Sequence, residues 1–417
     1  MNPVLLSWSI AFAATAGVIL RPFRWPEAIW AVAGALTLVM LGLLPASLAW
    51  QAVGKGADVY LFLIGMMLLS ELGRREGLFD WIAVLAVNHA HGSPRRLFLL
   101  VYVVGVVVTT FLSNDAAAVV LTPAVFAAAK KAETKPFPLL YVCAFIANAA
   151  SFVLPISNPA NLVLYANHTP ALSLWISRFA LPSVLSITAT FVALRWTQRD
   201  DLKGKCARGL PVARLSTNGK VTLAGIGVTA LTLLVVSALD LQLGLPTAIL
   251  GTVTAAVTLI RERQSPVELV RAISWSVLPL VAGLFVLVEM LDHTGVIGGL
   301  SHLLALATRQ NAPATAAVSG LAVALGSNAI NNLPAGLIAS ASAFQAHSPE
   351  RVIDALLIGV DLGPNLSITG SLATILWLTA IRREGEEVGF LQFLRIGLMV
   401  MLPALVLALG VRLLCGA

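Results

Sequence analysis

The sequence has few charged residues, few cysteines and none of the common catalytic motifs. Only 11% of its 417 residues are charged, whereas a soluble domain carries about a quarter. The three cysteines, Cys143, Cys206 and Cys415, lack CxxC or other metal-ligand spacing, so neither a disulfide framework nor a zinc site is indicated. GxxxxGK[ST], GxSxG and HExxH are also absent. We therefore expect no catalytic residues, no metal, no cofactor and no P-loop ATP hydrolysis by this chain.

Apolar residues are instead abundant, at 58% of the chain. They form stretches of about 20 residues, the length that a helix needs to span a bilayer. The first stretch, at 3–20, has no basic n-region and is followed by another span. We interpret it as a membrane helix and not as a cleaved signal peptide. The chain is predicted to be an all-α polytopic membrane protein in the lipid bilayer.

The net charge of +7 has a simple explanation in the distribution of the basic residues. Of 27 Lys and Arg, 22 lie in clusters, and the other five, Lys55, Arg178, Arg309, Arg351 and Arg412, lie in the alternate loops. The clusters are at Arg21/Arg24, Arg74/Arg75, Arg95/Arg96, Lys130/Lys131/Lys135, Arg195 to Lys220, Arg261/Arg263/Arg271 and Arg382/Arg383/Arg395. This asymmetry follows the positive-inside rule and places the clusters in the cytoplasm, so nucleic acid is not needed as a partner.

The charge pattern predicts two repeats with both chain termini outside a cytoplasmic (inner) membrane. Repeat 1 (1–196) is expected to contain spans 3–20, 27–45, 57–73, 137–167 and 172–196, with a hairpin at 97–129. A cytoplasmic linker (197–220) follows. Repeat 2 (221–417) is expected to contain spans 221–239, 244–260, 277–292, 352–377 and 389–414, with a hairpin at 312–346.

The segment 97–129 could be two full spans or a re-entrant hairpin, because basic residues flank both its ends. Its two arms are about 16 and 14 residues long, which favours the hairpin. Five spans are an odd number, so the second repeat is inverted and its hairpin opens outward. Gly65, Glu71 and Gly77 match Gly283, Glu289 and Gly295 at one offset, and 152–162 matches 365–375 at a slightly smaller one.

Polar residues interrupt the apolar stretches at corresponding places in the two repeats. Such residues persist at membrane depth where they are buried in protein or line a watery cavity, and paired breaks mark transporter binding sites. Helix interruption by Pro and Gly should free backbone donors and carbonyls there. The predicted substrate-binding residues are Ser113, Asn114, Asn148, Ser157, Asn158, Asn161, Ser327, Asn328, Asn331, Asn332, Asn365, Thr369 and Ser371. Hydrogen bonds that only join helices are the alternative explanation.

Two acids, Asp115 and Asp361, lie within these breaks. We interpret them as proton carriers, with a structural cap as the alternative. Glu71 and Glu289 lie farther away and are expected to form interfacial ion pairs. The six histidines (His89, His91, His168, His293, His302, His347) are expected in solvated or interfacial positions, and 78–91 could form a short surface helix.

Three segments, FLSNDAAAVVLTP, SNAINNLPAG and DLGPNLSITGSLATILW, resemble the ArsB-type arsenite/antimonite efflux permeases of the ion transporter superfamily. The resemblance spans nearly the whole chain. It implies a scaffold domain and a moving, elevator-like transport domain. It also implies export of arsenite and antimonite against proton entry, and an ArsA-type ATPase as a cytoplasmic partner where the host has one.

The residues fit this substrate class. As(OH)3 is small, neutral and rich in hydroxyls, so a pocket of Asn, Ser and Thr could hold it. Cys143 alone cannot make a three-sulfur site. A sodium/proton antiporter also fits Asp115 and Asp361, and a carboxylate carrier would need a cationic residue that neither break contains.

Overall fold

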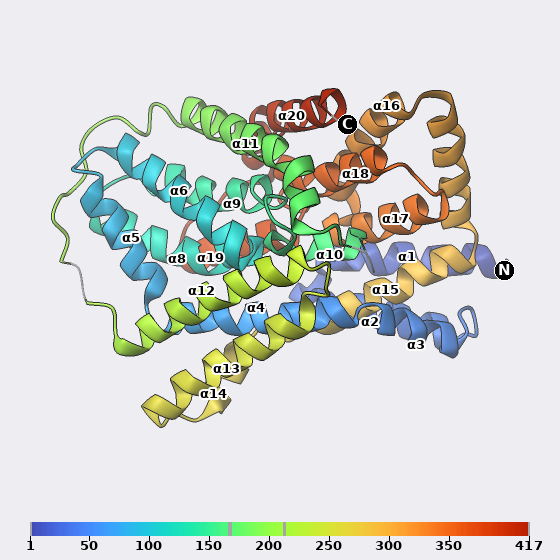
Figure 1. The fold of residues 1–417 in the computed structure, drawn as a ribbon, viewed down its shortest axis with the longest axis horizontal. Helices are drawn as coiled ribbons and strands as arrows, with labels where there is room; N and C mark the ends of the chain where they lie inside the picture. The colour runs from blue at the N-terminus through green and yellow to red at the C-terminus, as the bar shows by residue number, and fades with distance from the viewer. Residues whose placement is uncertain (1, 166–168, 212–213, 416–417) are drawn as a thin grey trace.

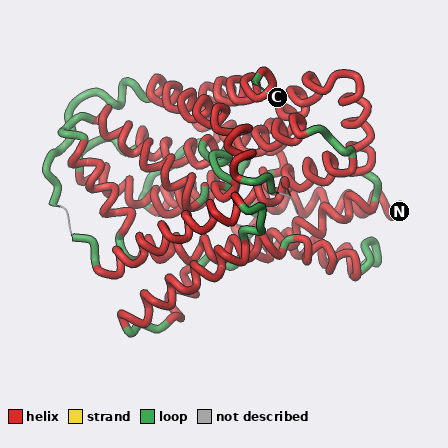
Figure 2. The backbone as a smooth tube through the Cα atoms, in the orientation of Figure 1, coloured by secondary structure: helices red, strands yellow, loops and turns green. Residues whose placement is uncertain are grey.

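The computed structural model describes residues 2–165, 169–211 and 214–415, and all regular elements in this part of the chain are helices (Figures 1 and 2). His168 and the end of the predicted span 137–167 lie outside the described residues. Seven described helices are long and apolar enough to cross a membrane, and nine if two bent helix pairs each count as one span. The predicted all-α polytopic class is confirmed.

The helices form two layers (Figure 1). The lower layer contains the first helices of each half of the chain, and α4 packs along α13 while α2 packs along α15. Its members are α1 (Pro3–Leu20), α2 (Glu27–Met40), α3 (Ala46–Lys55), α4 (Ala57–Arg75), α12 (Thr217–Ala238), α13 (Gly244–Glu262), α14 (Pro266–Ala272) and α15 (Val277–His293).

The upper layer contains the later helices of each half, with α11 packed along α20 and α16 along α18. Its members are α5 (Leu78–His89), α6 (Pro94–Leu112), α7 (Asn114–Ala116), α8 (Thr122–Lys131), α9 (Phe137–Ala149), α10 (Pro159–Tyr165), α11 (Leu172–Thr197), α16 (Val296–Ile330), α17 (Asn332–Gln345), α18 (Glu350–Leu362), α19 (Leu372–Arg383) and α20 (Phe390–Leu414). Helices α10 and α17 lie at the boundary, where they contact α4 and α15 respectively.

The start of α1 and the end of α20 lie on one side of the molecule, and the linker that follows α11 lies on the opposite side (Figure 1). The predicted topology requires this arrangement, because both termini were expected outside and the linker inside. The linker also bonds to the ends of the first predicted hairpin. The N–H of Cys206 donates to the carbonyl of Gly92 (3.1 Å), and that of Ala207 donates to Ala132 (2.8 Å). The two ends of the segment 94–131 are therefore neighbours, so the chain reverses between them.

The breaks within the two predicted hairpins share one unusual backbone geometry. Ser113 separates α6 from α7 with φ 119° and ψ 162°, and Asn331 separates α16 from α17 with φ 73° and ψ 155°. The two positions are 218 residues apart, the same offset that relates Gly77 to Gly295. Both of those glycines have positive φ and precede a helix, α5 and α16 respectively.

The predicted interruptions of the spans 137–167 and 352–377 are both present. Helix α9 ends at Ala149, and the short 3-10 turn η3 (Pro155–Ser157) precedes α10. In the second half, η4 (Gly363–Leu366) separates α18 from α19. Each predicted span is therefore two short helices joined by irregular backbone, as expected from the Pro and Gly residues.

Three element boundaries differ from the sequence-based prediction. Residues 46–55 form helix α3, which bends by 48° into α4. Helix α12 begins at Thr217, inside the predicted linker, because the Ser216 hydroxyl accepts a hydrogen bond from Gly219 N at 2.8 Å and caps the helix. Helix α16 begins at Val296 and bends at Asn311, so the first arm of the second hairpin continues an earlier helix. The expected short surface helix is confirmed as α5, which buries one face.

Small residues allow α16 and α18 to approach closely. Gly359 of α18 and Gly363, the residue that directly follows this helix, lie against the backbone of Gly320 and Ala324 on α16, where a Cβ on either residue would overlap a main-chain carbonyl. Both sides of the contact thus present small residues four positions apart, a common packing motif of membrane helices. This contact positions η4, which directly follows α18.

Candidate functional site

A small cavity lies where the hairpin breaks meet the broken helices. Its volume is about 20 Å³, which is room for about one water molecule. The cavity is therefore closed in this conformation. Its lining contains residues of α7, α10, α17 and α19 from the upper layer and residues of the lower layer on the other side. These are Leu63, Asn114, Asp115, Asn158, Pro159, Val277, Asn332, Leu333, Leu372 and Ala373.

Two of the lining amides, Asn114 and Asn332, follow directly after the strained residues Ser113 and Asn331. A positive φ at a residue other than glycine costs about 1–3 kcal/mol and persists where the surrounding structure enforces it. The Asn331 carboxamide stabilises its break by accepting a hydrogen bond from Leu333 N at 3.3 Å. The side-chain oxygen of Asn114 is buried and has no hydrogen-bond partner among the described residues. It can accept a hydrogen bond from a ligand hydroxyl.

A third amide, Asn158, connects the cavity to a buried carboxylate. Its oxygen accepts from Ala160 N (3.0 Å) and so caps α10, whose N-terminus points at the cavity. Its Nδ2 donates to Asp361 Oδ1 at 2.7 Å, across 203 residues of sequence. Asp361 is fully buried, and its second oxygen has no hydrogen-bond partner within the described part of the chain.

The second half arranges its break around Asn328. The Asn328 Nδ2 donates to the carbonyls of Ala324 (2.8 Å) and Gly363 (3.0 Å). Its side-chain oxygen accepts from the Ser367 hydroxyl at 2.7 Å, and its main-chain carbonyl accepts from the Thr369 hydroxyl at 3.0 Å. One amide thus holds the end of α16 against the irregular segment before α19.

The other predicted residues bond within and between the breaks. Asn148 Nδ2 donates to Asn365 Oδ1 (3.0 Å) and Thr374 Oγ1 (3.3 Å), which joins α9 to η4 and α19. Asn161 Nδ2 donates to the Ser151 carbonyl at 2.8 Å. The Ser371 hydroxyl accepts from Thr374 N at 3.1 Å and caps α19.

Four of the fifteen predicted site residues line the cavity: Asn114, Asn158, Asn332 and Asp115. The remaining ones lie behind them or beside the breaks, and hold the irregular backbone. They are Ser113, Asn148, Ser157, Asn161, Ser327, Asn328, Asn331, Asp361, Asn365, Thr369 and Ser371. The apolar lining residues Leu63 and Val277 were not predicted, because an apolar residue in an apolar stretch carries no signal of its own. Both belong to the lower layer, so the cavity lies between the layers.

The four acids considered in the sequence fall into two groups. Asp115 is half-buried at the cavity, and Asp361 is buried behind Asn158. Glu71 instead accepts from Arg74 Nε at 2.8 Å, and Glu289 accepts from Lys55 Nζ at 2.6 Å. The predicted ion pairing of the two glutamates is confirmed. All five described histidines are exposed.

A buried charge cluster was missed by sequence reasoning. Asp354 on α18 is fully buried and accepts from Arg412 Nη2 (2.6 Å) and from the Tyr165 hydroxyl (2.6 Å). The guanidinium of Arg178 lies 3.8 Å from the same carboxylate and also pairs with Glu350. In the sequence, Arg178 and Arg412 counted only as loop charges, because their proximity arises from the packing of α11, α18 and α20.

Comparison with known proteins identifies the family and agrees with the fold. The family description "Citrate transporter" (CitMHS) matches residues 15–363. Two arsenical pump membrane proteins of Escherichia coli are 26% and 27% identical to this chain, each over 98% of both chains. An arsenical pump membrane protein of Yersinia enterocolitica is 26% identical over 87% of this chain and 86% of its own.

Among solved structures, the YdaH transporter of Alcanivorax borkumensis aligns over 99% of this chain and 98% of its own, with a TM-score of 0.57 and 16% identity. This likeness shows a shared fold. The family match covers well over half of the chain. The arsenical pump membrane proteins of Escherichia coli align with this chain over nearly their whole length. The protein is therefore a multi-span membrane transporter that belongs to the citrate transporter family.

Proposed function

We propose that this transporter exports trivalent metalloid hydroxides, arsenite and antimonite, from the cytoplasm in exchange for protons. The observation that carries the proposal is the composition of the cavity. Amides from both halves of the chain, Asn114, Asn158 and Asn332, converge there with one carboxyl group, Asp115. A neutral As(OH)3 molecule needs hydrogen-bond acceptors and donors around its hydroxyls, and carboxamides supply both. The similarity to the arsenical pump membrane proteins supports the same substrate class.

The cavity must enlarge to admit this substrate, since it now holds about one water. Its walls belong to both layers, so movement of the upper layer against the lower layer would open it. We infer that the lower layer is the scaffold and that the upper layer is the transport domain of an elevator-like cycle. The proposed orientation is that of the sequence analysis, with five spans and one hairpin in each of two inverted repeats.

Proton coupling is assigned to Asp115 and Asp361. Asp115 lines the cavity, so a substrate and a proton can compete there. Asp361 is one hydrogen bond farther, behind Asn158. Exchange of a neutral solute for one proton moves one positive charge inward, which is worth about 3.5 kcal/mol at about 150 mV. That energy supports a concentration gradient of roughly 300-fold without ATP.

A carboxylate carrier is the second candidate, because the family is described by citrate transport and helix N-termini favour anionic groups. The cavity argues against it. Asp115 would repel a carboxylate, and the lining of the described cavity contains neither Lys nor Arg. The N-termini of α10, α17 and α19 also carry side-chain caps from Asn158, Asn331 and Ser371.

Expression in a metalloid-sensitive host tests the proposal. The wild-type gene should raise tolerance to arsenite and antimonite and leave sodium tolerance and citrate uptake unchanged. The variants Asn114→Ala and Asn332→Ala should lose this tolerance at normal membrane abundance. The matched control Gln345→Ala removes an exposed carboxamide that bonds Asp292 and should behave as wild type. A sodium phenotype or citrate uptake with unchanged metalloid tolerance would overturn the proposal.

A further inference from the structure

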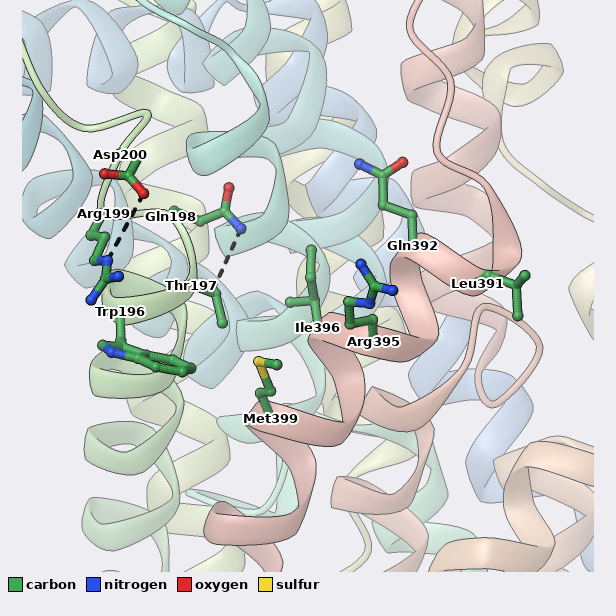
Figure 3. Close-up of a pocket in the computed structure, with 10 residues that line it drawn as sticks. All are labelled: Trp196, Thr197, Gln198, Arg199, Asp200, Leu391, Gln392, Arg395, Ile396 and Met399. Carbon is green, nitrogen blue, oxygen red and sulfur yellow. Dashed lines mark hydrogen bonds and ion pairs between the residues drawn. The ribbon is translucent and has the colours of Figure 1, made fainter.

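A second, much larger cavity lies between the adjacent ends of α11 and α20, away from the site described above. Its volume is about 560 Å³. Figure 3 shows Trp196, Gln198 and Arg199 on one side and Gln392, Arg395 and Met399 on the other. Both helix ends carry the basic clusters that the positive-inside rule assigns to the cytoplasm. The cavity therefore lies at the level where the headgroups of the inner leaflet would be.

The two arginines of this cavity are available to an anion. Arg395 is exposed and has no ion-pair partner in the described part of the chain. Arg199 lies 3.9 Å from Asp200, at the limit of an ion pair. Asp200 itself is held by Lys203 Nζ at 2.5 Å, and this hydrogen bond keeps the pKa of the Asp200 carboxyl below its ordinary value. Asp200 is thus held mainly by Lys203, and its pairing with Arg199 is a long one.

The membrane-facing part of the same cavity is apolar. Met399, one turn deeper along α20 than Arg395, is 41% exposed. Trp196, 56% exposed, lies beneath the Arg199 guanidinium, whose carbon is 5.8 Å from the centre of the indole ring. Tryptophan beside arginine is typical of the interface between headgroups and acyl chains. The carboxamides of Gln198 and Gln392 lie on the other side of the two arginines from Met399 and Trp196 (Figure 3).

We propose that this cavity binds an anionic phospholipid. Its phosphate lies between Arg199 and Arg395, the polar headgroup beyond the phosphate contacts the two glutamine carboxamides, and its acyl chains follow Met399 and Trp196. Basic pockets between membrane helices on the cytoplasmic side have the chemistry that recognises such headgroups. A lipid fits better than a free phosphate ion, because the apolar wall and the indole ring can pack against acyl chains but gain nothing from contact with an inorganic anion.

The site is connected to the transport layer through α20. Gly397, two residues beyond Arg395, lies against the main-chain carbonyls of Asn365 and Leu366 in η4. A Cβ at this position would overlap both oxygens. A lipid held at Arg395 is therefore bound two residues from the position on α20 that contacts the irregular segment before α19. The lipid would bind the part of the molecule that we expect to move.

Binding can be measured without any transport substrate, so the test is independent of the proposed function. Purified full-length protein in detergent would be titrated with phosphatidylglycerol, phosphatidylcholine and inorganic phosphate, and the bound lipid counted by native mass spectrometry. We expect phosphatidylglycerol to bind and the other two probes not to bind at equal phosphate concentration. Each arginine near an anionic headgroup contributes enough that Arg199→Gln with Arg395→Gln should weaken phosphatidylglycerol binding about 30-fold.

Two further variants make the result interpretable. Arg261→Gln with Arg271→Gln removes the same charge from exposed positions on α13 and α14 and should change binding less than twofold. Arg199→Lys with Arg395→Lys keeps the charge and should retain most of the binding. Equal weakening in the α13–α14 control would show general charge attraction and overturn the proposal. Equal binding of inorganic phosphate, or unchanged lipid binding in the Arg199/Arg395 double Gln variant, would also overturn it.

Discussion

Replacing Asp361 by asparagine should separate substrate binding from proton coupling. Asparagine has nearly the same size, and its side-chain oxygen can still accept the hydrogen bond that Asn158 Nδ2 now donates at 2.7 Å. A hydrogen bond to a charged group contributes about 1.5–3 kcal/mol and a neutral one about 0.5–1.5 kcal/mol. The variant therefore loses about 1 kcal/mol at this hydrogen bond. That loss changes the equilibrium constant of the conformation that contains the bond by a factor of about 5.

The functional loss should be far larger. If the Asp361 carboxyl carries the coupling proton, the variant forfeits the whole contribution of about 3.5 kcal/mol from the membrane potential. Energised everted vesicles that contain wild-type protein should accumulate radiolabelled arsenite up to roughly 300-fold. Vesicles with Asp361→Asn should equilibrate without accumulation, although antimonite should still raise the melting temperature of the purified variant.

Two variants make this result specific. Asp115→Asn tests the second assigned carboxyl, and at least one of the two variants should lose coupling while it retains binding. Asp240→Asn is the control, because Asp240 is an exposed residue with φ 58°, a conformation that asparagine adopts readily. Normal accumulation by both Asp361→Asn and Asp115→Asn would refute the assignment and move the proton path to other residues.

Three further changes test the structure elsewhere. Cys143→Ser should keep most transport, because Cys143 is buried and donates only to the Leu139 carbonyl; loss of metalloid binding by folded protein would instead show a thiolate role. Asp354→Asn should lower stability by about 3–5 kcal/mol, since it leaves the buried Arg412 without its anionic partner, and thermal unfolding that matches wild type would contradict this. Gly359→Ala should lower the melting temperature, at a cost of about 1–3 kcal/mol, because its Cβ would overlap the Gly320 carbonyl; an unchanged melting temperature would show that α16 and α18 separate freely.

The sequence predicts most of the long helices because their signal is local. A run of about 20 apolar residues with basic flanks is enough to place helices such as α1, α11 and α20, and Pro and Gly are enough to place the irregular segments in two later spans. Helix α3 was missed because residues 46–55 are amphipathic and short, so hydropathy alone does not separate them from a loop. The part of α16 before the bend at Asn311 was missed for the same reason, since residues 296–310 mix apolar and polar groups and lie outside the predicted hairpin at 312–346.

The candidate site was harder to predict than the fold. Clustered amides and carboxyls identified segments that meet at the cavity, yet only the folded arrangement distinguishes Asn114, which faces the cavity, from Asn161, which bonds the backbone of its own break. Side-chain direction in irregular backbone depends on φ and ψ, which no periodicity specifies. The partnership of Asn158 with Asp361 and of Asp354 with Arg412 likewise depends on helix packing between distant segments.

The hydrogen bonds that join the two halves also constrain how the protein is made. Asn158 is synthesised 203 residues before Asp361, and Asn148 is synthesised 217 residues before Asn365. At a translation rate of about 5–20 residues per second, the first half waits roughly 10–40 seconds for these partners. During that interval the Nδ2 groups of Asn148 and Asn158 lack the second-half acceptors that they bond in the folded protein. The unfinished first half is thus accessible to membrane chaperones and proteases until the second half has been synthesised. A truncated chain that ends at the linker should therefore be degraded.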